Sequence, residues 1–309
     1  MLAVTLVCAV LTGCGSTPSS TPTATPTPEP TSTPTVAPSP TETPAPTATA
    51  TPAPTPTPTP PALTLKHCPG RTPTAGGGTS VALISTNWSG YVAGDGRAGG
   101  ATCVEGAWVE PVVTCPRTGL TEVAIWVGLD GFTSDHLGST RVGPEQVGTD
   151  VVCDDGGLFH EAWWQTYPSL KYLISFGDVI TPASGDHMWA QVAYSSAGFT
   201  MTLTDLTSQQ TDAITRQVKG ATRLTAEWVV EAPSGVCSKA TCPTRPLARF
   251  SRITFSGGEA VIAGRLGSIG DRHWSRDSVI DETSSGTRRT TISGLSSTGL
   301  GFSVVWHHV

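Results

Sequence analysis

From Val81 onward the chain alternates apolar and polar residues in short runs, each closed by glycine, proline, aspartate or serine. Alternation with a period of two predicts half-buried β-strands, and no stretch repeats apolar residues at helical spacing between caps. The runs cover residues 87–92, 101–113, 122–129, 159–167, 188–194, 199–203, 223–231, 247–255, 290–294 and 301–307. Strands at this spacing predict an all-β sandwich or barrel.

One predicted strand, residues 225–233, carries two glutamates among apolar residues. Successive side chains of a strand point to opposite sides, so Glu227 and Glu231 share one face while Trp228 and Val230 share the other. The Trp228 face is expected to pack in the core. The glutamate face is either solvated, as in many antiparallel sheets, or part of a polar site.

Two further runs place aromatic and polar side chains on one face. The residues concerned are Trp126 and Asp130 in one run, and Glu161, Trp163, Gln165 and Tyr167 in the other. A fully solvated face rarely collects tryptophan beside carboxylates and amides. Such a mixture indicates a groove for an extended ligand, either a peptide or a sugar chain, although a single tryptophan is more often a core residue.

The first 64 residues differ from the rest in composition. Residues 1–14 form a short apolar run that ends at Cys14, the pattern of a lipoprotein signal whose cysteine becomes acylated; an ordinary secretory signal cleaved elsewhere is the alternative. Residues 15–64 are mostly threonine, proline, alanine and serine, with 16 of the 26 prolines between positions 17 and 61, and are predicted to form a disordered linker. Residues 65–309 remain for one domain.

The charge pattern and the cysteines narrow the function further. The net charge is −6 and there is no basic run, which argues against nucleic acid as a partner. Six cysteines follow the linker, and an even number in an exported chain predicts disulfides. Cys237 and Cys242 are close enough to close one loop, whereas the pairing of the other four cysteines stays open: Cys68, Cys103, Cys115 and Cys153. No spacing matches a zinc motif, and neither a metal nor a cofactor is expected.

The usual catalytic motifs are missing from the sequence. It contains no Gly-x-Ser-x-Gly, no His-Glu-x-x-His, no glycine-rich phosphate loop, and neither Asp-Thr-Gly nor Asp-Ser-Gly. Asp150, Asp154 and Asp155 form a weak candidate for calcium, and His307 and His308 fit surface positions better than ligands. Carboxylates, amides and aromatic residues on strands remain, and they serve glycoside or peptide hydrolysis.

Seven segments, taken in order, carry a family resemblance. They are Thr86-Asn87-Trp88-Ser89-Gly90-Tyr91, Trp108-Val109-Glu110-Pro111, Trp126-Val127-Gly128-Leu129-Asp130-Gly131, Gln146-Val147-Gly148-Thr149-Asp150, Ala162-Trp163-Trp164-Gln165-Thr166-Tyr167-Pro168, Glu227-Trp228-Val229-Val230-Glu231-Ala232-Pro233 and Leu247-Ala248-Arg249-Phe250. Over about residues 84–260 this order resembles the glutamic peptidases, also called eqolisins or peptidase family G1. The resemblance implies a concanavalin-like sandwich of two large antiparallel sheets, with the catalytic residues on the concave sheet.

The resemblance also implies roles for individual residues. Gln146 and Glu231 match the catalytic pair, and Glu227 is a neighbour of the second. The residues implied to line the cleft are Trp126, Asp130, Glu161, Trp163, Gln165 and Tyr167. Gln165 departs from the acid that fungal members tend to carry, so the pH optimum is expected to differ. The loop between Cys237 and Cys242 matches a loop disulfide of the family. The Thr/Pro-rich linker stands where fungal members carry a charged propeptide, so activation by propeptide removal is not expected.

Together these observations predict an acid endopeptidase that is insensitive to pepstatin. Glu231 would act as general base and acid on water, and Gln146 would donate to the developing oxyanion. The expected partner is a polypeptide substrate. The protein is expected to be monomeric, at the cell surface or outside the cell, and in contact with a membrane only through a lipid anchor. The alternatives are a carbohydrate-binding module or glycosidase, and an inactive relative that binds peptides.

Overall fold

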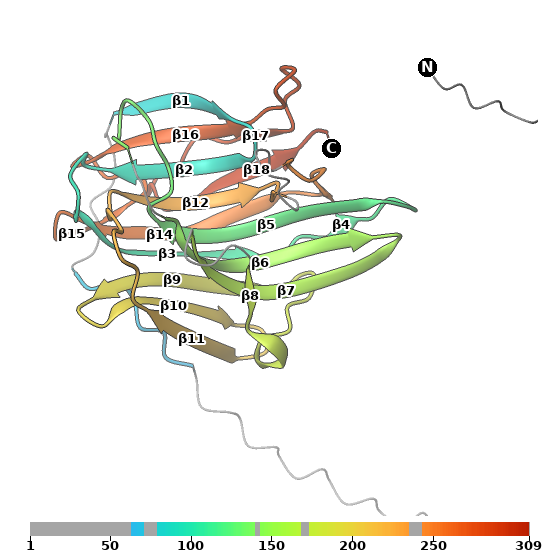
Figure 1. Ribbon diagram of the computed structural model, residues 1–309, viewed down its shortest axis with the longest axis horizontal. Helices are drawn as coiled ribbons and strands as arrows, with labels where there is room; N and C mark the ends of the chain where they lie inside the picture. Colours follow the sequence, from blue (N-terminus) through green and yellow to red (C-terminus); the bar gives the residue numbers. More distant parts are fainter. Residues whose placement is uncertain (1–62, 71–78, 140–142, 168–172, 235–242, 309) are drawn as a thin grey trace, which may run out of the picture. The chain divides into compact units, whose positions relative to one another are not determined.

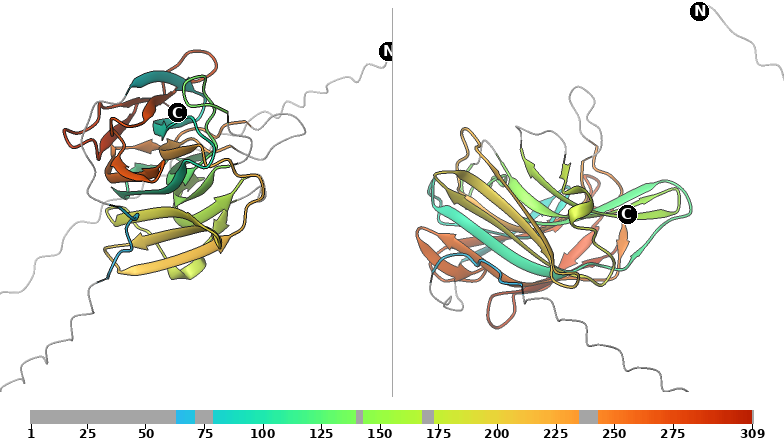
Figure 2. Two further views of the ribbon diagram at one scale, coloured as in Figure 1. Left: turned by 90° about the vertical axis from the view of Figure 1, so that its left-hand side faces the viewer. Right: turned by 90° about the horizontal axis from the view of Figure 1, so that it is seen from below.

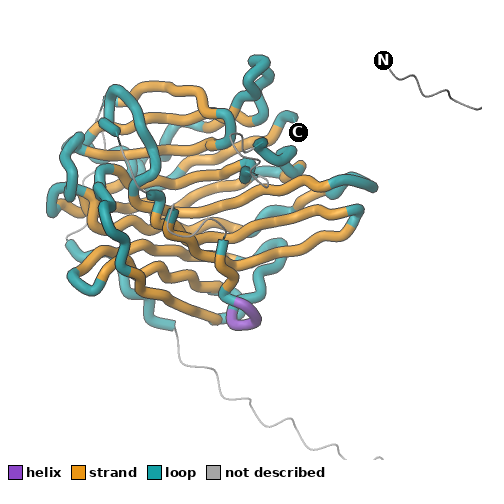
Figure 3. Tube along the Cα trace, viewed as in Figure 1, coloured by secondary structure: helices purple, strands orange, loops and turns teal. Residues whose placement is uncertain are grey.

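The structure is a computed structural model that describes residues 63–70, 79–139, 143–167, 173–234 and 243–308. These residues all belong to the unit Pro60–Val309. Within them the only helix is the 3-10 turn η1 (Gly177–Val179), and the other regular elements are strands (Figure 3). In this described part no helix is long and apolar enough to cross a membrane.

Two large sheets form the two layers of the domain, which confirms the predicted sandwich (Figures 1 and 2). The first sheet contains, in spatial order, β1 (Ser80–Ser85), β16 (Ser275–Asp281), β2 (Trp88–Gly94), β12 (Thr225–Glu231), β5 (Leu120–Leu129), β6 (Glu145–Asp154), β7 (Gly157–Thr166) and β8 (Ile174–Ser175). Neighbouring strands are antiparallel, except that β1 and β16 run parallel.

The second sheet lies behind the first in Figure 1. Its order is β11 (Gln210–Arg216), β10 (Gly198–Asp205), β9 (His187–Ser195), β3 (Ala101–Val109), β14 (Ile253–Ile262), β18 (Phe302–Trp306) and β17 (Thr290–Ile292), with β15 (Arg265–Ser268) paired to β14. A small pair, β4 (Val113–Thr114) and β13 (Arg249–Phe250), completes the strands of the described part.

The core lies between the two sheets, and β12 shows how the sequence builds it. Trp228 and Val230 are buried in the main hydrophobic cluster, as the alternation predicted. The Trp228 indole reaches the other sheet, where its Nε1 donates to the backbone oxygen of Glu105 at 2.8 Å. Gly106 permits this approach, because a Cβ there would lie 3.0 Å from Cδ1 of Trp228. The opposite face of β12 is therefore free to carry polar residues.

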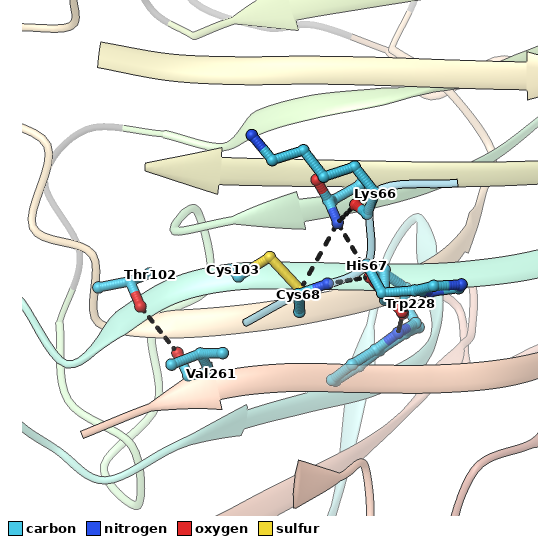
Figure 4. Close-up of a disulfide and its surroundings, with 9 residues drawn as sticks. Lys66, His67, Cys68, Thr102, Cys103, Trp228 and Val261 are labelled. Atoms are coloured by element: carbon cyan, nitrogen blue, oxygen red, sulfur yellow. Dashed lines mark hydrogen bonds and ion pairs between the residues drawn. A yellow bond between two sulfur atoms is a disulfide. The ribbon is translucent and has the colours of Figure 1, made fainter. Parts of the chain in front are cut away.

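A disulfide fastens the N-terminal segment, residues 63–70, to the second sheet (Figure 4). Cys68 is bonded to Cys103 on β3, and the buried Glu105 carboxylate accepts hydrogen bonds from the backbone nitrogen of Cys68 at 2.6 Å and from Gln191 Nε2 at 2.9 Å. A second disulfide joins Cys115 to Cys153. The predicted pair Cys237 and Cys242 lies outside the described residues.

The predicted strands are mostly present, with instructive differences. The run 101–113 is divided into β3 and β4, because Pro111 has no backbone N–H for a ladder. The sequence-based assignment omitted β6 altogether, although β6 carries Gln146. Val147 and Val151 of β6 pack in the core, but polar residues and Gly148 between them make the apolar alternation difficult to recognise in the sequence. His307 and His308 follow β18 and are exposed, as expected.

Candidate active site

The face of the first sheet that points away from the core collects the predicted site residues; we call it the site face. Strands β12, β5, β6 and β7 lie side by side there, and their register sets three cross-strand rows. The first row is Glu227, Gly128, Gln146 and Gln165. The second is Val229, Trp126, Gly148 and Trp163, and the third is Glu231, Ala124, Asp150 and Glu161. The rows bring residues that are about 100 positions apart in the sequence, such as Glu227 and Gly128, onto one surface.

Glu231 is the last residue of β12 and remains partly exposed. Its Oε1 accepts a hydrogen bond from Asn87 Nδ2 at 2.8 Å, and its Oε2 accepts one from Trp126 Nε1 at 2.9 Å. Burial raises the pKa of Glu231 to about 7; hydrogen bonds from Trp126, Trp88 and Asn87 oppose the rise, and the charge of Glu122 adds to it. The carboxyl is thus held in one orientation and is able to exchange a proton near neutral pH.

Gln146 lies in the first row, two rows from Glu231. Its Nε2 donates to Gln165 Oε1 at 2.6 Å, whereas its buried Oε1 has no partner among the described residues. No hydrogen bond joins Gln146 to Glu231 within the described part, so the two side chains are separated by the row that contains Trp126. A substrate group or a water between them would have to make the link.

The Trp126 indole connects the two positions. Its Nε1 reaches Glu231, while the opposite edge of the ring lies against Gly128, where an added Cβ would be 2.9 Å from Trp126 Cζ3 and 3.3 Å from Gln146 Cβ. Because Gly128 has no Cβ, the Trp126 ring has room to lie beside Gln146. Trp126 is fully buried and packs edge-on against Trp88, with 4.9 Å between ring centroids.

Glu227 differs sharply from Glu231 although it is only two positions away on the same face. It is completely buried, and neither carboxyl oxygen has a partner among the described residues. Burial, reinforced by Asp130 and Glu145, raises the pKa of Glu227 well above its ordinary value. The raised pKa favours the protonated form of Glu227, which fits a structural neighbour better than a base.

Asp130 comes just after β5, where its charge acts on Glu227 and Glu145, and it stays a predicted residue of the cleft. The residue follows β5 with a φ of 66°, in the left-handed region, and so leaves the strand's alternation. Its carboxylate accepts hydrogen bonds from Thr222 Oγ1 at 2.8 Å and from the backbone nitrogens of Arg223 and Leu224, the latter at 2.7 Å. Asp130 thereby holds the segment that leads into β12.

The residues of β7 are divided between the site face and the surface. Trp163 is buried against Ala124, Trp126 and Val229, and its Nε1 has no partner among the described residues. Glu161 and Tyr167 are exposed, and the latter follows the end of the strand. They lie at the rim of the site face and stay predicted substrate contacts.

Sequence reasoning missed four residues that surround the candidate base. Asn87 and Trp88 belong to the motif at residues 86–91, but the sequence predicted no role for them. For Glu122 and Arg245 it predicted no role in the site either. Glu122 shares its face of β5 with Ala124 and Trp126, so the same alternation could have found it. Asp150 contacts this acidic group, whereas Asp154 and Asp155 are exposed; no group of three or more metal-binding side chains exists among the described residues.

A β-sandwich that holds an oriented glutamate beside tryptophan and amide side chains fits the class of enzymes that hydrolyse bonds with carboxylates. The chain belongs to the Peptidase A4 family, whose family model matches residues 86–301. It is 30% identical over 210 residues to Aspergillopepsin-2 of Aspergillus niger, a match that covers 60% of this chain and 68% of that protein. The resemblance to glutamic peptidases is thereby confirmed.

Solved structures agree on the fold. Scytalido-glutamic peptidase with a peptide-based transition-state analogue matches with a TM-score of 0.57 and 23% identity, over 72% of this chain and 99% of that one. SCP-B, a member of the eqolisin family in a complex with the tripeptide Ala-Ile-His, matches with a TM-score of 0.55 and 22% identity over the same shares. Both have the two-sheet sandwich found here.

Proposed function

We propose that the protein is an endopeptidase in which Glu231 activates water and Gln146 stabilises the oxyanion. The observation that carries the proposal is the setting of Glu231: a partly exposed carboxyl, fixed by Asn87 and Trp126, whose pKa burial raises to about 7. A general base works best when its pKa lies near the working pH. Membership of the Peptidase A4 family supports the same activity.

In the proposed reaction the Glu231 carboxylate removes a proton from the water that attacks the scissile carbonyl carbon. The carbonyl oxygen becomes an oxyanion, and the Gln146 amide donates a hydrogen bond to it. Glu231 then returns the proton to the departing nitrogen as the carbon–nitrogen bond breaks. An oxyanion donor of this kind contributes about 3–4 kcal/mol to transition-state stabilisation. In this structure one hydrogen of Gln146 Nε2 is donated to Gln165 Oε1, and the second hydrogen of the amide would be donated to the oxyanion.

The expected pH optimum depends on the pKa of Glu231. An unperturbed glutamate, with a pKa of about 4.3, favours an acid optimum. Because the pKa of Glu231 is raised, its carboxylate becomes protonated at a pH closer to neutral. The protonated form cannot act as a base, so activity is expected to decline there. The predicted acid optimum and the predicted insensitivity to pepstatin stay predictions, and we expect the optimum to lie less far into acid than that of an unperturbed glutamate.

Casein cleavage by the purified protein, assayed from pH 3 to 8 with pepstatin and a chelator present, tests the proposal. Glu231→Gln and Gln146→Ala should both lose cleavage while the fold is retained. Glu227→Gln is the matched control, since it makes the same change two positions away and should keep measurable activity. Persistent cleavage by Glu231→Gln would place the base elsewhere. Polysaccharide binding without proteolysis, or peptide binding without hydrolysis, would favour the two alternative functions.

We also propose that this domain is carried at the outside of a cell by the N-terminal residues. The signal at 1–14, acylation of Cys14, the linker at 15–64 and the domain boundary at 65 stay predictions. The two disulfides of the described part support an oxidising compartment. Mass spectrometry of the mature N-terminus should find a lipid-modified Cys14; an unmodified N-terminus elsewhere would contradict the anchor.

A further inference from the structure

A second acidic group lies directly beside the candidate base, on the third cross-strand row. Ala124 pairs with Glu231 on one side and with Asp150 on the other. Glu122 is the next residue on this face of β5. Asp150 and Glu122 are both buried, with 2% and 4% of their surface exposed. Three carboxyl groups therefore meet within one small patch.

Glu122 is fixed in this patch by the segment that precedes β13. Its carboxylate forms an ion pair with Nη1 of Arg245, a residue that is about one third exposed. Its backbone nitrogen donates to the oxygen of Pro246 at 3.0 Å, and its backbone oxygen accepts from the nitrogen of Ala248 at 3.0 Å. Three contacts thus lock Glu122 beside the end of β12, which indicates that its charge stays in a fixed position.

Asp150 interacts with Glu122 inside this patch. Burial raises the pKa of Asp150 well above its ordinary value, and the neighbouring Glu122 raises it further both by its charge and by a hydrogen bond. The Glu122 carboxyl thus lies between Asp150 and Arg245, and the ion pair with Arg245 balances its charge. The exposed Glu161 is the remaining carboxylate of the row. The groups that contact Glu231 are Asn87, which precedes β2, Trp88 on β2 and Trp126 on β5, and none of the three carries a charge.

We propose that Glu122 and Arg245 are positioning residues that act through Glu231, setting the pH at which this glutamate can accept a proton from water. The inference rests on the proposed role of Glu231. A negative charge at Glu122 makes ionisation of Glu231 less favourable, and the positive charge of Arg245 offsets part of this effect. The two residues thus act with opposite signs on the same carboxyl.

Because the two charges have opposite effects on Glu231, removing each one should shift the pH profile in the opposite direction. A merely structural role would not produce this result. Glu122→Gln should move the acidic limb of the kcat/KM profile to lower pH, and Arg245→Gln should move it to higher pH, each by on the order of one unit. The double variant removes both charges and should return the limb close to that of the wild type. Glu259→Gln makes the same chemical change as Glu122→Gln on the second sheet, and should leave the limb unmoved.

The ionisation of Glu231 can also be followed without activity, by NMR titration of protein labelled with ¹³C at the glutamate carboxyls, with Glu231→Gln identifying its signal. The midpoint should fall in Glu122→Gln and rise in Arg245→Gln. Shifts in the same direction, or none in folded variants, would overturn the inference. If the wild type titrates as described but cleaves no peptide at any pH, the proposed function fails while the coupling between these residues stands.

Discussion

Trp126 donates its indole N–H to Oε2 of Glu231 at 2.9 Å, and the same ring lies against Gly128 beside Gln146. One side chain therefore orients the candidate base and fills the space between it and the candidate oxyanion donor.

The hydrogen bond from Trp126 stabilises the charged carboxylate of Glu231 and so lowers its pKa. Replacing Trp126 with phenylalanine removes this bond and should therefore raise the pKa of Glu231. The acidic limb of kcat/KM should move to higher pH by about one unit, which corresponds to about 1.4 kcal/mol. Trp163→Phe is the matched control: the Trp163 Nε1 has no partner among the described residues, so this variant loses no hydrogen bond. Equal shifts in both variants would show that ring size matters rather than the N–H.

An alanine at position 128 should lower activity without unfolding the protein. Its Cβ would lie 2.9 Å from Trp126 Cζ3 and 3.3 Å from Gln146 Cβ, so the ring and the amide must shift. A displacement of this size in a catalytic group typically costs about tenfold to 100-fold in kcat/KM. Gly294→Ala provides the control, since a Cβ there meets nothing within 4 Å. Unchanged kcat/KM in Gly128→Ala would mean that the indole position is not critical.

The acidic limb of the wild-type profile should lie above the ordinary glutamate value, toward 7. Below that pH Glu231 becomes protonated and can no longer accept a proton from water, so kcat/KM should decline as the pH falls. A pH series of kcat/KM with a short peptide measures the limb directly. A limb at or below about 4.3 would mean that Glu231 ionises like an exposed glutamate or that another group is the base.

Buried acids should make the domain more stable in acid than at mildly alkaline pH. Burial raises the pKa of Glu145 to about 8, with Asp130 adding to the rise. Between an unfolded value of about 4.3 and the folded value of about 8, the folded state binds the extra proton, so the free energy of unfolding falls as the pH rises. Urea unfolding at pH 4.5 and 8.5 measures the difference. Glu145→Gln should flatten the dependence, whereas an unchanged slope would contradict the assignment.

Removing the disulfide between Cys68 and Cys103 should weaken the fold but spare the site. The bond spans 35 residues, and closing such a loop contributes about 2–4 kcal/mol to the free energy of unfolding. The double variant Cys68→Ser/Cys103→Ser should unfold at lower urea concentration and keep its kcat/KM. A marked loss of kcat/KM would reveal a connection between the second sheet and the site face that the structure gives no reason to expect.

The sequence was informative where alternation and motif agreed. In β12 the period of two correctly assigned Trp228 and Val230 to the core and Glu227 and Glu231 to the other face. Alternation could not tell the two glutamates apart, because the difference comes from neighbours on other strands. Of the two glutamates, only Glu231 accepts hydrogen bonds from Asn87 and Trp126, whereas Asp130 and Glu145 lie near Glu227.

Other features were beyond sequence reasoning for physical reasons. Asp130 follows β5 in a left-handed turn, and alternation could not foresee its hydrogen bonds to residues 222–224. Glu110, part of a quoted motif, is buried and accepts a hydrogen bond from Trp108 Nε1 at 3.0 Å, so that motif serves the core. Arg245 joins Glu122 across 123 positions, and only the fold brings them together.

The attachment of the N-terminal segment has a mechanical consequence. The segment is bonded through Cys68 to β3, in the sheet opposite the site face. A force applied through the N-terminus would therefore be carried by a covalent bond into the second sheet, and the strands that hold Glu231 and Gln146 would bear little of it. A domain pulled or pivoted at this end could keep its site undistorted.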